Sequence, residues 1–366
     1  MSILFSSIRL GPVSLKNRIV VAPMCQYSAV DGRATDWHVM HLGSLALSGA
    51  GMLLIEATAV EPQGRISPAD LGLWSETQQT ALDRVLQAVR AHAAVPILVQ
   101  LAHAGRKAST AVPWEGGAQI APAAGGWTTE APSPVPYAPE EATPHALDAA
   151  GLDRIEAAFV AAARRAEALD LAGVEVHCAH GYLLHQFLSP LSNRREDAYG
   201  GTLENRLRFP LRVIAAVRAA LSRDRVLGVR ISATDWVPAG WDLEQSLAFV
   251  QRIKALGCDY IHVSSGGLSP AQRIPVGPGY QVSLAARIRR EVGLPTIAVG
   301  LITEPLQAET IIASGQADMV ALARGILYDP RWPWHAAAAL GAQADAPPQY
   351  LRCPPHGFKK LFPSPA

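Results

Sequence analysis

Two histidines and a tyrosine, His177, His180 and Tyr182, lie within six residues of one another, directly after an apolar run. Imidazoles can bind a metal ion, form hydrogen bonds in a packed polar corner, or stabilise a developing oxyanion. A phenol can donate a proton to a reacting group. The spacing alone leaves open a metal site, a packed corner and a proton-transfer site, so the elements that position these side chains must decide.

Eight short runs rich in Val, Ile, Leu and Ala are typical of buried parallel strands. They span residues 18–24, 51–58, 96–103, 173–180, 226–235, 260–266, 295–300 and 319–325. Helical patterns alternate with them, for example at 77–93, 152–173, 204–221, 244–257 and 304–315. This order predicts an α/β fold, a single (β/α)8 TIM barrel forming one domain over residues 1–366. A doubly wound sheet is the alternative, but no G-x-G-x-x-G follows the first strand.

One segment, residues 111–147, departs from this alternation because it is rich in Pro and Gly and has little helical pattern. It follows the third strand, so in a barrel it lies at the C-terminal face. Loops of this length are often lids or binding loops. Trp114 and Trp127 favour a packed, lid-like covering insertion rather than a tolerated surface loop. Residues 347–366 form a C-terminal tail.

The composition excludes several classes of function. The formal net charge is +1, without a long run of one sign, which argues against nucleic acid or an anionic membrane as the main partner. No apolar stretch of about 18 residues and no secretory pattern is visible, so no membrane span is expected. The four cysteines, Cys25, Cys178, Cys258 and Cys353, form no CxxC pair. This argues against a metal cluster or disulfide framework and favours a reducing, cytoplasmic setting.

Side chains at the C-terminal ends of barrel strands face the active site. Besides the trio after the fourth strand, these ends carry Pro23, Met24, Cys25, Tyr27, Glu56, Ala57, Thr58, Gln100, His103, Arg106, Lys107, Arg230, Thr234, Asp235, Ser264, Ser265, Gly266, Gly300, Arg324 and Gly325. Strand alternation predicts that Glu175 and His177 point into the barrel and Cys178 points outward. Gly181 then permits the bend that brings the chain over the mouth.

An unpaired arginine is costly in a barrel interior, so Arg230 must meet an anionic ligand or a carboxylate. Gly300 and Gly325 end the seventh and eighth strands, where backbone N–H groups commonly bind phosphate. Together these positions suggest a phosphorylated cofactor with a planar ring. Gln100 and Arg230 could meet that ring, with His177, His180 and Tyr182 above it.

At this point the chain resembles, over nearly its whole length, the Old Yellow Enzyme family of flavin-dependent ene-reductases. The similarity is to the bacterial branch that has a cysteine near the flavin, which includes xenobiotic reductases and NADPH dehydrogenases. The stretches that carry it are PMCQYSA (23–29), EATAVEPQGRIS (56–67), QLAHAGRK (100–107), HCAHGYLLHQFLSPLSNRREDAYGG (177–201), ENRLRFPL (204–211), VRISATDW (229–236) and ALARGILYDPRW (321–332).

The resemblance implies a barrel that binds FMN noncovalently and takes electrons from NADPH or NADH. The substrate would be an enone or enal, with hydride passing from flavin N5 to the β-carbon. His177 and His180 would hold the carbonyl oxygen, Tyr182 would donate a proton to the α-carbon, and Tyr27 would line the substrate pocket.

The resemblance also implies a set of FMN-binding residues. Those around the ring would be Pro23, Met24, Cys25, Ala57, Gln100, Lys107 and Arg230, and those at the phosphate Gly300, Ala323, Arg324 and Gly325. The segment QYLR (349–352) resembles one through which a subunit places an arginine in its neighbour's active site. Arg352 would then bind substrate in a homodimer or a dimer of dimers.

Three other functions are consistent with some of these residues. A metal-dependent hydrolase would use His103, His177, His180 and Asp235 as ligands, although no tight H-x-H pair is present. A lyase would form a Schiff base on Lys107. A flavin-binding or scaffold barrel without turnover is the non-enzymatic alternative. The reductase is favoured because it also accounts for Gln100 and Arg230, and it needs no metal.

Overall fold

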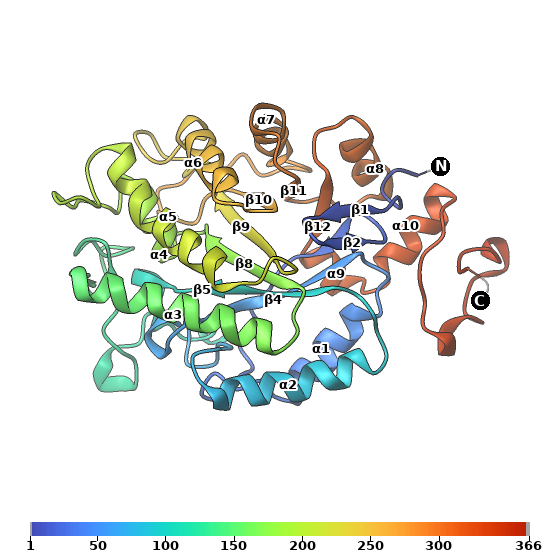
Figure 1. Ribbon diagram of the computed structural model, residues 1–366, viewed down its shortest axis with the longest axis horizontal. Helices are drawn as coiled ribbons and strands as arrows, with labels where there is room; N and C mark the ends of the chain where they lie inside the picture. The colour runs from blue at the N-terminus through green and yellow to red at the C-terminus, as the bar shows by residue number, and fades with distance from the viewer. Residues whose placement is uncertain (1, 364–366) are drawn as a thin grey trace.

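The computed structural model describes residues 2–363. Eight parallel strands close into a barrel, with helices on its outside (Figure 1). Around the barrel the strands are β3 (Ile19–Val21), β4 (Met52–Ala59), β5 (Ile97–Ala102), β8 (Gly173–Cys178), β9 (Val226–Ser232), β10 (Tyr260–Ser264), β11 (Thr296–Val299) and β12 (Met319–Leu322), which pairs with β3. Seven strands lie within their predicted runs, and β4 extends one residue beyond its run, to Ala59. The (β/α)8 TIM barrel is therefore confirmed, and closure excludes the doubly wound sheet.

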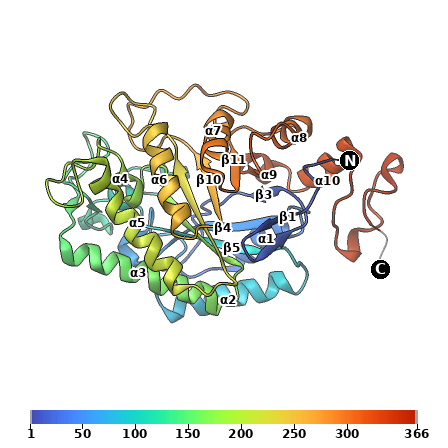
Figure 2. The same cartoon turned by 45° about the horizontal axis from the view of Figure 1, so that its top comes forward.

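Helices pack around the outside of the barrel, most of them between successive strands and two after the last strand (Figure 2). They are α1 (Asp36–Ala46), α2 (Glu76–Arg90), α3 (Ala149–Ala168), α4 (Leu183–Leu188), α5 (Leu203–Ala220), α6 (Leu243–Ala255), α7 (Val282–Val292), α8 (Pro305–Ala313), α9 (Arg324–Tyr328) and α10 (Trp332–Leu340). Polar side chains fix several helix starts by accepting a hydrogen bond from a first-turn N–H. Asp148 does so for α3, Thr202 for α5 and Asp242 for α6.

The two faces of each strand pack against different partners. Val174, Val176 and Cys178 of β8 point outward into the layer between barrel and helices, whereas Glu175 forms its hydrogen bonds inside the barrel. The predicted alternation, with an outward Cys178, is therefore confirmed. A hairpin of β1 (Ile8–Leu10) and β2 (Val13–Leu15) joins the apolar cluster that fills the lower interior.

The insertion after β5 contains two single-turn helices and two short strands, β6 (Glu130–Ala131) and β7 (His145–Ala146). Trp127 packs as expected: its Nε1 donates to the Gln63 carbonyl at 3.0 Å, and the Arg65 guanidinium lies 4.9 Å from its ring centre. Trp114 differs from the prediction, because it is 68% exposed and contacts Tyr27 only by an edge-to-face arrangement.

The C-terminal tail packs beside α10, at the edge of the molecule in Figure 1. Trp334 of α10 contacts the rings of Tyr350 and Phe362 from the tail, with ring centres 6.1 and 4.9 Å away. Between residues 2 and 363, no helix has the length and apolar character needed to cross a membrane.

Candidate active site

The three side chains after β8 gather at the barrel mouth. The ring of His177 lies 5.1 Å from that of His180 and 4.9 Å from that of Tyr182, in both cases nearly perpendicular. The structure thus brings the predicted trio together. His177 is buried, whereas His180 and Tyr182 are partly exposed.

The bend at the second histidine depends on two successive left-handed residues. His180 has φ +56° and Gly181 has φ +76°. A β-carbon on Gly181 would lie 2.2 Å from the Gly267 carbonyl oxygen, so only glycine allows this close approach to the loop after β10. Ser232 also supports the bend, since its hydroxyl accepts from the His180 backbone N–H at 2.9 Å.

Lys107 ties the same two loops together. Its ammonium donates to the carbonyl oxygens of His180 and Gly267, both at 2.9 Å, and lies 5.3 Å from the centre of the Tyr182 ring. Burial, and then the charge of Arg106, lowers its pKa to about 8. Because it donates to both carbonyl oxygens, Lys107 holds the histidine loop in place, and this structural role, rather than its lowered pKa, argues against the Schiff-base lyase.

Both histidines are neutral in this environment. Burial, followed by the charge of Arg230, holds the pKa of His177 and of His180 well below the usual range. His177 Nδ1 accepts from the Ala179 N–H at 3.1 Å, so its proton resides on Nε2. His180 Nε2 lies 2.8 Å from the Ser264 hydroxyl. Each ring can therefore offer one N–H donor to an anionic oxygen.

Two buried polar atoms on neighbouring strands lack a hydrogen-bond partner in the part of the chain that the structure describes. They are Nε of Arg230 on β9 and Nε2 of His262 on β10, which are paired across the two strands. Arg230 is 8% exposed and makes no ion pair within residues 2–363. Because an unpaired buried guanidinium is costly, Arg230 fits a ligand with acceptor groups at the barrel mouth. The His262 ring donates from Nδ1 to Glu175 and burial lowers its pKa, so its Nε2 is left to accept a hydrogen bond.

Below this level, the barrel interior holds a buried carboxylate. Glu175 accepts from Nε2 of Gln100 at 2.7 Å and from the Tyr260 hydroxyl at 3.1 Å. Nδ1 of His262 lies 3.0 Å from the same carboxylate. Gln100 therefore has its carbonyl oxygen free of this contact and can present it to a ring N–H.

The loop after β3 forms a second wall. Glu56 accepts from the Gln26 N–H at 2.8 Å and pairs with His38 of α1 at 3.2 Å. This loop carries Cys25 and Tyr27, and the latter has a left-handed φ of +49°. Burial, and then the charges of Asp70 and Glu56, raises the pKa of the Cys25 thiol, so Cys25 is a thiol rather than a thiolate.

The ends of β11 and β12 provide backbone rather than side-chain groups. Gly300 has φ +121°, and a β-carbon there would lie 2.6 Å from Nε2 of the Gln281 side chain. A β-carbon on Gly325 would meet nothing within 4 Å. Ala323 is partly exposed and Arg324 is exposed. These features suit close approach of a phosphate to the backbone.

The residues expected to bind FMN fit that group by their chemistry. Buried or half-buried apolar and thiol groups, namely Pro23, Met24, Cys25 and Ala57, suit a planar ring. The orphaned Arg230 and His262 atoms and the free Gln100 carbonyl suit its polar edge. Arg352, on the tail, is exposed. Its role in substrate binding stays a prediction.

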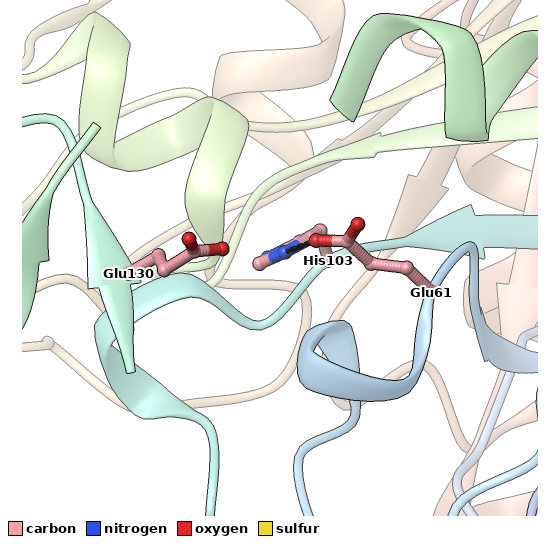
Figure 3. A group of neighbouring side chains, drawn as sticks. All are labelled: Glu61, His103 and Glu130. Atoms are coloured by element: carbon pink, nitrogen blue, oxygen red, sulfur yellow. Dashed lines mark hydrogen bonds and ion pairs between the residues drawn. The ribbon is translucent and has the colours of Figure 1, made fainter. Parts of the chain in front are cut away.

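The predicted metal ligands do not converge. Asp235 Oδ1 lies 2.9 Å from Nε2 of His185, and its other oxygen accepts from Ser189. Within the described residues, the one candidate metal group is Glu61, His103 and Glu130 (Figure 3).

In that group, His103 Nε2 lies 2.9 Å from Glu61 Oε1. Arg154 forms ion pairs with both carboxylates, including one of 2.6 Å to Glu130. A cation already balances these charges, so the cluster is better explained as an ion-pair network that joins the insertion to α3. The metal-dependent hydrolase is therefore disfavoured.

Sequence reasoning missed the roles of several residues at this site. His262 lies two positions before Ser264 on the same face of β10, so strand alternation could have identified it. His185 is also functional in the framework, since its Nδ1 accepts from the Gly181 N–H at 2.9 Å. It lies eight residues after His177 in the chain, but nothing in the spacing distinguished it from a packed helix residue.

Comparison with known proteins agrees with this arrangement. Residues 3–343 match the model of the NADH:flavin oxidoreductase / NADH oxidase family. The chain is 45% identical to an NADPH dehydrogenase of Geobacillus thermodenitrificans, over 96% of this chain and 98% of that protein. It is 44% identical to an NADPH dehydrogenase of Listeria innocua, over 96% and 99% of the two chains.

Among solved structures, the chain is similar to morphinone reductase in complex with tetrahydroNAD. The TM-score is 0.75 and the identity 26%, covering 99% of this chain and 98% of that one. These similarities establish FMN with NADPH or NADH as the redox partners of this barrel.

Proposed function

Since the chain belongs to the NADH:flavin oxidoreductase / NADH oxidase family, as an FMN-dependent NAD(P)H oxidoreductase of the Old Yellow Enzyme type, we propose that it reduces the activated C=C bond of α,β-unsaturated carbonyl compounds. The observation that carries this proposal is the cluster of two neutral imidazoles and one phenol, His177, His180 and Tyr182, at the mouth above Arg230. Such donors suit an oxygen that becomes negative during the reaction.

When bound and reduced, FMN supplies the hydride that the β-carbon receives. Nε2–H of His177 and one N–H of His180 hold the carbonyl oxygen, on which charge develops. Tyr182 transfers its phenolic proton to the α-carbon, which completes saturation of the bond and restores the carbonyl. Burial raises the pKa of Tyr182, so the phenol is protonated at neutral pH. Water then returns a proton to the tyrosinate.

The remaining site assignments support this chemistry. Gln100 and Arg230 would hold the polar edge of the ring, Pro23, Met24, Cys25 and Ala57 would contact it, and Lys107, which donates to the His180 carbonyl, would lie close by. Gly300, Ala323, Arg324 and Gly325 would hold the phosphate through their backbone or side chains. Tyr27, contacted by Trp114 at 5.9 Å between ring centres, lines the substrate pocket.

We also propose that the enzyme works as a homodimer or dimer of dimers in which Arg352 reaches a neighbouring site. Its exposure on a tail that packs beside α10 supports this. A cytoplasmic setting is consistent with the four free cysteines.

The test separates the two half-reactions. The anaerobic protein is reduced with one equivalent of NADPH and then mixed with 2-cyclohexenone. The proposal predicts reoxidation of the flavin together with stoichiometric cyclohexanone. Reoxidation by oxygen but not by cyclohexenone or by any of a panel of enals would refute ene-reduction.

A further inference from the structure

Glu175 is a fully buried carboxylate inside the barrel, and the mechanism above does not use it. It lies on β8 two residues before His177, on the same inward face. Its strand partner on β9 is Gly228, where a β-carbon would lie 2.0 Å from the Tyr260 ring. Gly228 thus leaves the space in which that ring stands beneath the carboxylate.

Three donors converge on Glu175. Gln100 donates to Oε1 at 2.7 Å, while the Tyr260 hydroxyl and His262 Nδ1 share Oε2 at 3.1 and 3.0 Å. Gln100 and His262 belong to the strands on either side of the β8–β9 pair. A carboxylate with this many donors is stabilised as the anion.

The charges around Glu175 agree with an ionised carboxylate. Burial alone would raise its pKa, but the neighbouring His262 and then Arg230 and Gln100 bring the pKa below the ordinary value. Burial lowers the pKa of Arg230, and the charge of Glu175 is the largest effect that opposes this decrease. Arg230 has no direct partner among residues 2–363, so this compensation acts through space.

We propose that Glu175 is a positioning residue that orients the Gln100 amide toward the FMN ring and sets the net charge that Arg230 presents to it. Gln100 donates to Glu175 through Nε2, so its side-chain carbonyl oxygen is the atom left to accept a hydrogen bond from the ring. The negative charge below also offsets part of the positive field of Arg230. This inference rests on the proposed placement of FMN.

The physical consequence concerns the stability of reduced relative to oxidised FMN. Reduction adds negative charge to the ring, and a nearby cation favours that state. Removing the Glu175 charge leaves Arg230 less compensated, so reduced FMN should be favoured. The same change frees the Gln100 amide to rotate, so oxidised FMN should bind more weakly to the apoprotein.

The test is the Glu175→Gln variant, measured by the midpoint potential of its bound FMN and by FMN titration of the apoprotein. We expect the ratio of dissociation constants, oxidised over reduced, to rise about tenfold, which is a midpoint about 30 mV more positive for a two-electron couple. The matched control is Tyr260→Phe, which removes one hydrogen bond to the same carboxylate but keeps its charge. Its ratio should stay within about twofold of the wild type.

A second variant covers the case in which Glu175→Gln does not fold or hold FMN. Glu175→Asp keeps the charge but withdraws it by one methylene, so the ratio should move in the same direction by a smaller factor. An unchanged or more negative midpoint in whichever variant binds FMN would overturn the inference, as would an equal shift in Tyr260→Phe. Failure of the proposed function would instead appear in the wild-type protein, as no reoxidation by enones.

Discussion

Replacing Tyr182 with Phe removes one oxygen atom and, among the described residues, breaks no hydrogen bond of the side chain. The ring contacts with His177 and Lys107 remain possible. The free energy of unfolding should therefore change by less than about 0.5 kcal/mol. Loss of a positioned general acid should slow the proton-dependent step by roughly 10²–10⁴-fold.

Anaerobic stopped-flow measurements separate the two effects. Flavin reduction by NADPH needs no phenolic proton, so its rate should stay within about twofold of the wild type, whereas reoxidation by 2-cyclohexenone should show the full loss. The matched control is Tyr137→Phe, whose ring also lies under Lys107, at 4.8 Å. It should leave both rates unchanged. Equal slowing of both half-reactions in Tyr182→Phe would refute the assignment of the proton donor.

Replacing both His177 and His180 with Ala should weaken binding of 4-chlorophenol, a mimic of the anionic oxygen, by at least about tenfold in a spectral titration; full retention would count against their role. Burial raises the pKa of Asp70 from 3.8 to about 7. The protonated form therefore stabilises the fold below about pH 4, and this contribution is lost as the pH rises through about 7. The difference in unfolding free energy between Asp70→Asn and the wild type should therefore shift by about 2–3 kcal/mol in favour of the variant as the pH rises from about 5 to about 8. Urea titrations measure it, and parallel pH profiles of the two proteins would contradict this. Because the partner's tail is proposed to complete the site, Arg352→Ala should raise the substrate KM about tenfold or more and leave flavin reduction unchanged. Unchanged kinetics would show that Arg352 does not bind substrate.

Much of the barrel could be predicted because its information is local. Strands buried on both faces need near-continuous apolar runs, and all eight were visible as such. The direction of Cys178 followed from alternation along β8 and the two-residue repeat of a strand. Trp114 could not be placed in this way, because the packing of a long insertion depends on contacts with segments far away in the chain.

The chemistry of the site could be predicted only in part from the sequence. His177, His180 and Tyr182 were identified because they are adjacent in the chain, on one loop. The left-handed backbone of His180 was not foreseen, since it is supported by Lys107, which follows β5, and by Ser232 on β9. Asp235 was a candidate ligand by residue type, but its partner His185 decides its role, and that contact spans 50 residues of chain. Long-range pairings of this kind have no signature in spacing.

The central claim is that Arg230 and its neighbours hold FMN beneath the imidazole pair. The most direct measurement is a fluorescence titration of the apoprotein with FMN, for the wild type and for Arg230→Met. The account predicts one FMN per wild-type chain and at least about tenfold weaker binding to the variant, because its cation no longer meets the ring. A wild-type protein that binds no FMN, or a variant that binds it as tightly, would contradict the account.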